Sequence, residues 1–149
     1  MLKVGDKVPE FEGVDQNGKT ILSSNYKGKK LVVFFYPKAS TPGCTAEACD
    51  LRDNEEALKA QGYELIGVSA DSVERQKKFA DKYNLPFPLL ADEDHSILNI
   101  FGVWGPKKFM GREFDGIHRT TFIIDENGVV DDVITKVKTK EHAKQILEQ

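Results

Sequence analysis

The chain has 149 residues, of which 40% are hydrophobic and 30% charged, and we expect it to form a single folded domain spanning residues 1–149. The net charge of −3 predicts neither a nucleic-acid partner nor attraction to an acidic membrane surface. The longest apolar run, residues 31–36, is too short to cross a bilayer, and residues 1–6 contain no apolar segment typical of a signal peptide. We therefore expect a cytoplasmic protein, in which two cysteines are more often reactive than a permanent cross-link.

The first third of the chain predicts a β-hairpin, a buried strand and a helix. Residues 11–22 can form the hairpin, because Asn17-Gly18 tolerates the positive φ angles of a tight turn. Residues 31–36 are continuously apolar, which is typical of a strand covered on both faces. The helix is predicted from about residue 45 to residue 60.

The rest of the chain alternates strands with helices. A second buried strand is predicted at residues 64–69, and Asp71 or Ser72 is expected to cap a helix that ends near residue 83. Residues 102–116, rich in glycine and in mixed charge, are interpreted as a surface loop. The other predicted elements are a strand at 89–91, a helix at 96–101, strands at 120–125 and 129–134, and a helix capped by Thr139 that ends at residue 147. This order predicts an α/β fold with a mixed central sheet flanked by helices.

Cys44 follows the buried strand and the turn Thr41-Pro42-Gly43, at the predicted start of a helix. Unpaired N–H groups and the positive end of the helix dipole favour a thiolate there, which is the nucleophilic form of cysteine. The same N–H groups can hold a peroxide oxygen or an oxyanion. We therefore expect a reactive thiol, although most free cysteines are small buried hydrophobes.

The second cysteine, Cys49, lies five residues after Cys44. Five residues of helix turn by about 140° and rise about 7.5 Å, which places the two Cα atoms about 8.6 Å apart. A disulfide tolerates at most about 6.8 Å. The two cysteines can therefore bond only if the first turns of the helix unwind. Cys44 shares an apolar stripe with Ala48 and Leu51, whereas Cys49 is expected on another face.

Three other classes of protein are alternative interpretations of this cysteine pair. A thiol–disulfide oxidoreductase uses Cys-x-x-Cys, and the four-residue gap argues against it. A phosphatase loop of the form Cys-x5-Arg fails because position 50 is aspartate. A binding module or metal carrier is the non-catalytic alternative, but two cysteines and three scattered histidines have no zinc-ligand spacing.

The run Pro37-x-x-x-Thr41-x-x-Cys44 resembles the active-site motif of the peroxiredoxins. The spacing from Cys44 to Cys49 resembles the bacterioferritin-comigratory-protein (PrxQ) subfamily, in which a resolving cysteine follows the peroxidatic cysteine by five residues. The resemblance covers nearly the whole chain, with further matches at residues 4–9, 67–71 and 116–125.

This resemblance implies a thioredoxin fold and the reduction of hydrogen peroxide and organic hydroperoxides. Cys44 would be the peroxidatic cysteine, whose thiolate becomes a sulfenic acid. Thr41 would donate its hydroxyl to the peroxide, Arg119 would stabilise the thiolate and the transition-state oxygens, and Pro37 would shield the site. Cys49 would then form an intramolecular disulfide that a thioredoxin-like protein reduces. No metal, haem or flavin cofactor is implied, and the expected state is a monomer or a weak homodimer.

Overall fold

The apolar run after residue 29 forms β3 (Lys30–Phe35), the middle strand of a five-stranded sheet in a computed structural model that describes residues 1–148. The strand order is β5-β4-β3-β8-β9. The pairs β3–β4 and β4–β5 are parallel, and the pairs β3–β8 and β8–β9 are antiparallel, so the sheet is mixed as predicted. The other four strands are β4 (Tyr63–Ser69), β5 (Leu89–Ala91), β8 (Thr120–Ile124) and β9 (Val130–Ile134).

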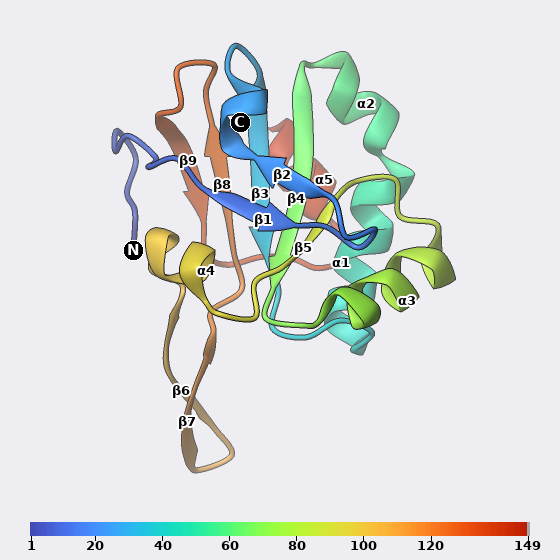
Figure 1. The fold of residues 1–149 in the computed structure, drawn as a ribbon, viewed down its shortest axis with the longest axis vertical. Helices are drawn as coiled ribbons and strands as arrows, with labels where there is room; N and C mark the ends of the chain where they lie inside the picture. The colour runs from blue at the N-terminus through green and yellow to red at the C-terminus, as the bar shows by residue number, and fades with distance from the viewer. Residues whose placement is uncertain (149) are drawn as a thin grey trace.

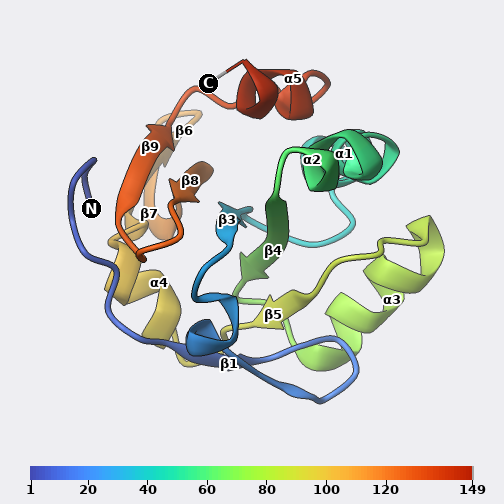
Figure 2. The same ribbon diagram turned by 90° about the horizontal axis from the view of Figure 1, so that it is seen from above.

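Both faces of the sheet are covered (Figures 1 and 2). One face packs against α1 (Pro42–Asp53), α2 (Glu55–Ala60) and α5 (His142–Leu147), with α3 (Val73–Tyr83) beside β5. The other face packs against α4 (Ser96–Phe101) and the N-terminal segment, which includes β1 (Glu12–Val14), β2 (Thr20–Leu22) and the 3-10 turn η1 (Ser23–Tyr26). Within residues 1–148, no helix has the length and apolar character needed to cross a bilayer.

Alternate side chains of β3 enter two separate cores, because successive residues of a strand face opposite sides. Val32 and Phe34 belong to the core under α1 and α2. Leu31, Val33 and Phe35 belong to the core that contains α4. This explains why the run is apolar at every position, and the predicted strand and N-terminal hairpin are both confirmed.

The helix boundaries differ from the predicted ones at three places. The helix that carries Cys44 begins at Pro42 instead of residue 45, and it is interrupted at Asn54, which separates α1 from α2. Of the two residues predicted to cap α3, Ser72 is the cap, because its Oγ accepts a hydrogen bond from the Arg75 backbone N–H at 3.2 Å. The prediction that Thr139 caps the last helix is wrong, since α5 begins only at His142.

The interpretation of residues 102–116 as a loop is also wrong. They contain most of an antiparallel hairpin formed by β6 (Trp104–Phe109) and β7 (Arg112–Ile117), which projects from the body of the protein (Figure 1). Its turn is at Met110 and Gly111, whose φ angles are 52° and 78°. Most β7 side chains are exposed, so the strand carries no apolar alternation from which a hairpin could be predicted.

Candidate active site

Cys44 is the third residue of α1, directly after the loop that leaves β3. Thr41 is the N-cap residue in an extended conformation, and Pro42 occupies the first helical position, where a missing N–H is tolerated. The first bond of the helix runs from the Thr45 N–H to the Thr41 carbonyl at 2.8 Å. The N–H groups of Gly43 and Cys44 precede that bond, so the helix itself offers them no acceptor. They are available to a negatively charged oxygen or sulfur.

The loop between β3 and α1 is held by a carboxylate from the end of β4. Asp71 is 8% exposed, and its Oδ2 accepts hydrogen bonds from the Ala39 N–H and the Ser69 hydroxyl, both at 2.7 Å. Ser40, the residue after Ala39, adopts a left-handed conformation with φ of 65°. This anchoring sets the direction in which the chain enters α1, and Pro37 lies half-buried at the start of the loop.

Arg119 lies over the thiol. Its Nη2 is 3.3 Å from the Cys44 Sγ, and its Nη1 is 2.6 Å from the Glu47 Oε1. Burial lowers the pKa of Arg119, but the negative charges of Glu47 and Cys44 outweigh burial and leave this pKa raised. A Cβ atom on Gly43 would be 3.2 Å from Nη2, so the glycine leaves room for the guanidinium group. The arrangement places a permanent cation on the sulfur.

Glu47 completes this cluster, and its role was missed in the sequence. Its side chain is fully buried, which raises its pKa to about 7 although Arg119 acts in the opposite direction. A glutamate in a helix is usually exposed to solvent, so its residue type did not indicate a buried role in the site. One signal was present: Glu47 lies three residues after Cys44 and therefore shares the buried face with Ala48 and Leu51.

His142 joins the cluster from α5. The ring is fully buried, with Nε2 at 2.7 Å from the Thr121 Oγ1 and Nδ1 at 2.8 Å from the Gln145 Oε1. Nε2 is also 3.6 Å from the second oxygen of Glu47, Oε2. Burial lowers the pKa of His142, although Gln145 and Asp50 offset part of that effect. No spacing in the sequence connects this histidine with Cys44.

Lys107, on β6, adds a second positive charge near the thiol. Its Nζ donates to the Ile117 carbonyl at 2.7 Å. Burial lowers the pKa of Lys107, Arg119 lowers it further, and Cys44 acts in the opposite direction. The sequence could not indicate this residue, because its strand was interpreted as a loop.

The predicted site residues are brought together to different degrees. Cys44 and Arg119 are in direct contact, and Thr41 and Pro37 lie on the chain that leads into α1. The Thr41 hydroxyl already donates to the Lys38 carbonyl at 2.8 Å, so its proton is engaged and its lone pairs remain to accept. Cys49 lies half-buried on the same helix as Cys44, and both are free thiols in the part of the chain that the structure describes.

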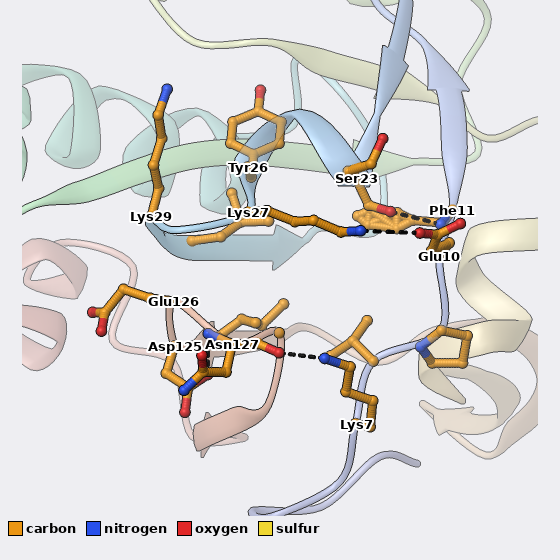
Figure 3. A pocket seen from close by; sticks show the side chains of 16 residues that line it. Lys7, Glu10, Phe11, Ser23, Tyr26, Lys27, Lys29, Asp125, Glu126 and Asn127 are labelled. Atoms are coloured by element: carbon orange, nitrogen blue, oxygen red, sulfur yellow. Dashed lines mark hydrogen bonds and ion pairs between the residues drawn. The ribbon is translucent and has the colours of Figure 1, made fainter.

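A cavity of about 340 Å³ lies at the opposite end of the sheet (Figure 3). Leu31, at the start of β3, and Ile124, at the end of β8, contribute to its lining. Lys27 forms an ion pair with Glu10 at 3.6 Å, and the Lys7 ammonium group donates to the Asn127 carbonyl. Because lysines and acidic residues line the cavity in similar number, its charge favours no class of ligand, and the reactive groups remain those around Cys44.

A thiol at a helix start beneath an arginine is the arrangement of a reactive, catalytic cysteine. The AhpC/TSA family model matches residues 4–133. The chain is 47% identical over 146 residues to peroxiredoxin Bcp of Escherichia coli K12, covering 98% of this chain and 94% of that protein. It is 46% identical over 147 residues to peroxiredoxin Bcp of Bacillus subtilis 168, covering 99% and 94%. The chain therefore belongs to the AhpC/TSA family, and the peroxiredoxin resemblance is confirmed.

Solved structures agree with this assignment. The bacterioferritin comigratory protein of Xanthomonas campestris, described with respect to its alkyl peroxide reduction activity, superposes with a TM-score of 0.87 at 33% identity, covering 96% of each chain. The predicted thioredoxin fold is thereby confirmed. The chain is a peroxidase of the oxidoreductase class, and peroxide substrates and thioredoxin-type reduction fit its family.

Proposed function

We propose that Cys44 reduces hydrogen peroxide and organic hydroperoxides, with Cys49 as the resolving cysteine and a thioredoxin-like protein as the reductant. The single observation that carries this proposal is the 3.3 Å contact between the Arg119 Nη2 and the Cys44 Sγ at the start of α1. A cation on the sulfur favours the thiolate, and the same guanidinium group can bind oxygens that gain charge during the reaction.

In the first step, the Cys44 thiolate attacks the distal oxygen of the peroxide. The S–O bond forms as the O–O bond breaks, and the leaving hydroxide or alkoxide takes up a proton to become water or an alcohol. Arg119 and the N–H groups of Gly43 and Cys44 would hold the oxygens in line. Because the Thr41 hydroxyl proton is engaged by Lys38, Thr41 would accept a hydrogen bond from the peroxide rather than donate one. Pro37 would limit the access of water.

In the second step, the Cys49 thiolate attacks the sulfur of the Cys44 sulfenic acid. The S–S bond forms, and hydroxide leaves and is protonated to water. Both cysteines lie on α1, and an intact helix keeps their Cα atoms about 8.6 Å apart, so this step requires the helix start to unwind. A dithiol protein of the thioredoxin type then reduces the disulfide by thiol–disulfide exchange.

We further propose a cytoplasmic, single-domain protein that works as a monomer or a weak homodimer. The net charge of −3 supports an absence of nucleic-acid and membrane partners. The reaction sequence uses two thiols and a cation from this chain, and no step of it calls on a metal, haem or flavin.

The decisive experiment couples peroxide reduction to NADPH consumption through thioredoxin and thioredoxin reductase. We expect catalytic turnover with hydrogen peroxide and with tert-butyl hydroperoxide, and loss of both in Cys44→Ser. The Thr45→Ser variant is a matched control, because it changes a neighbouring hydroxyl residue of the same helix. Turnover that persists in Cys44→Ser would exclude Cys44 as the peroxidatic residue.

A further inference from the structure

Glu47 lies between the two cysteines on α1, in the segment that must unwind before they can bond. Unwinding changes the surroundings of Glu47 more than those of an exposed helical residue, because its side chain is fully buried. Whatever favours or opposes the burial of this carboxyl group therefore acts on the unwinding equilibrium itself. The inference below rests on the proposed role of Cys49 and concerns what controls that step.

The carboxyl group of Glu47 has few partners for a buried acid. Arg119, from the connection between β7 and β8, donates to Oε1 at 2.6 Å, and it also contacts Cys44. Oε2 has no hydrogen-bond partner among residues 1–148. Asp50, on the same helix, accepts a bond from the Ala143 N–H, and Lys107 donates to the Ile117 carbonyl, where its charge interacts with that of Arg119.

His142, the group nearest to Oε2, offers a lone pair and not a proton. The Gln145 Oε1 accepts from the Lys138 N–H while its amide nitrogen donates to the Lys136 carbonyl, which fixes the orientation of the amide. The His142 Nδ1 must therefore carry the hydrogen that it shares with Oε1. Burial lowers the pKa of His142 and so favours the neutral ring, in which Nε2 accepts from the Thr121 hydroxyl.

The ionised form of Glu47 is consequently poorly supported in the folded helix. A buried carboxylate is stable only when several donors or a dedicated cation replace the lost water. Here one cation serves both the carboxylate and the thiol, and the second oxygen has no donor. Burial raises the pKa from the ordinary value of 4.5 to about 7, so the balance favours the protonated acid more strongly in the helix than in water.

We propose that Glu47 is a positioning residue for the resolving step: a proton on its buried carboxyl group holds the first turns of α1 helical, and loss of that proton favours the unwound segment in which Cys49 reaches oxidised Cys44. The sign follows from linkage, because a group whose pKa is higher in the folded state stabilises that state at low pH. The stabilisation is fully present below about pH 4.5 and is lost as the pH rises through about 7.

The test measures helix opening without any peroxide chemistry. In the full-length Cys44→Ser/Cys49→Ser protein no thiol titrates, and amide exchange divided by the intrinsic rate gives the opening equilibrium of α1. Between pH 6 and pH 8 we expect the protection of the first two turns of α1 to fall about tenfold. This is the ratio expected when Glu47 has a pKa of 4.5 in the unwound segment and about 7 in the helix. Protection in α3, which forms no hydrogen bond or ion pair with Glu47 among the described residues, should stay constant and is the internal control.

The matched variant adds Glu47→Gln to the same double-serine protein. Glutamine has nearly the same shape but cannot ionise, so its α1 protection should not change between pH 6 and pH 8. A fall of equal size with glutamine would assign the effect to another group. Constant protection with glutamate would mean that the proton on Glu47 does not control the unwinding of α1. Either result overturns the proposal. Should Glu47→Gln fail to fold, constant α1 protection in the glutamate protein would still overturn the proposal. Peroxidase activity is not used, so this result is independent of the proposed function.

Discussion

Arg119 and Cys44 are 75 residues apart in the chain, yet the Arg119 Nη2 lies 3.3 Å from the Cys44 Sγ. The contact follows from the antiparallel pairing of β3 with β8, in which Phe35 faces Thr120. The chain leaving β3 and the chain entering β8 therefore meet at one end of the sheet, where α1 begins. The pairing of two buried strands thus places the cation of the site over its nucleophile.

The first prediction concerns Arg119. Replacement by methionine removes the cation from the sulfur and should slow the first oxidation of Cys44 by about 10²-fold or more. Arg119→Lys should lose less, because an ammonium group keeps the charge but has all its donors on one nitrogen, whereas Arg119 contacts Cys44 and Glu47 with two. Stopped-flow mixing with hydrogen peroxide measures the rate. Arg112→Lys, on exposed β7, is the control, and equal rates for it and Arg119→Met would contradict the assigned role.

The second prediction concerns Gly43. Alanine is more favourable than glycine within a helix by up to about 1 kcal/mol, so Gly43→Ala should leave the melting temperature unchanged or raise it. The new Cβ would nevertheless lie 3.2 Å from the Arg119 Nη2 and should displace the guanidinium group from Cys44. Peroxide oxidation should therefore slow while stability is kept. A variant that reacts at the wild-type rate would mean that Arg119 adjusts without losing its effect on the thiol.

The third prediction separates the two cysteines. Cys49→Ser should keep the first oxidation of Cys44 and lose recycling by thioredoxin, because no intramolecular disulfide can form. Mass spectrometry after one equivalent of peroxide should detect added oxygen in Cys49→Ser and a loss of two hydrogens in the wild type. Cys44→Ser should give neither product. Wild-type recycling in Cys49→Ser would require a mechanism with one cysteine.

The sequence predicted most strands because local apolar patterns indicate which residues are buried. Residues 31–36 are apolar at every position because the strand is covered on both faces. The β6–β7 hairpin carries no such pattern, since most of its β7 side chains are exposed. Thr139 was misassigned as a cap because the start of α5 depends on the packing of His142 and Ala143 against the rest of the fold.

Residue patterns in the sequence indicated only the local part of the site, and Arg119 came from the family resemblance. Pro37, Thr41 and Cys44 lie close together in the chain, and their spacing carries the family resemblance that assigns them roles. Glu47 had only its helical spacing from Cys44 as a signal, and His142 had none. Their roles depend on contacts across 72 residues to Arg119 and from α5 to α1. A glutamate or a histidine becomes unusual only when the fold removes it from water.

The fourth prediction concerns Asp71, which anchors the loop before α1. Asp71→Ala leaves the Ala39 N–H and the Ser69 hydroxyl without their acceptor and should lower the free energy of unfolding by about 2 kcal/mol. Arg75→Ala is the control, because its 3.7 Å ion pair with Asp71 involves an exposed side chain and should contribute less than about 1 kcal/mol. Urea unfolding of the reduced proteins measures both. Equal losses would assign the effect to the ion pair and not to the loop.

The fifth prediction concerns the disulfide form. An intact α1 keeps the two Cα atoms about 8.6 Å apart, beyond the roughly 6.8 Å that a disulfide permits. Oxidation should therefore unwind the segment from Cys44 to Cys49, and its amides should exchange faster with solvent than in the reduced protein. The later turns of α1 should keep their protection, because Leu51 is buried and the Asp50 carboxylate accepts a hydrogen bond from the Ala143 N–H of α5. Unchanged exchange at the helix start in a protein whose mass proves the disulfide would contradict the geometric argument, because the bond would then have formed without unwinding.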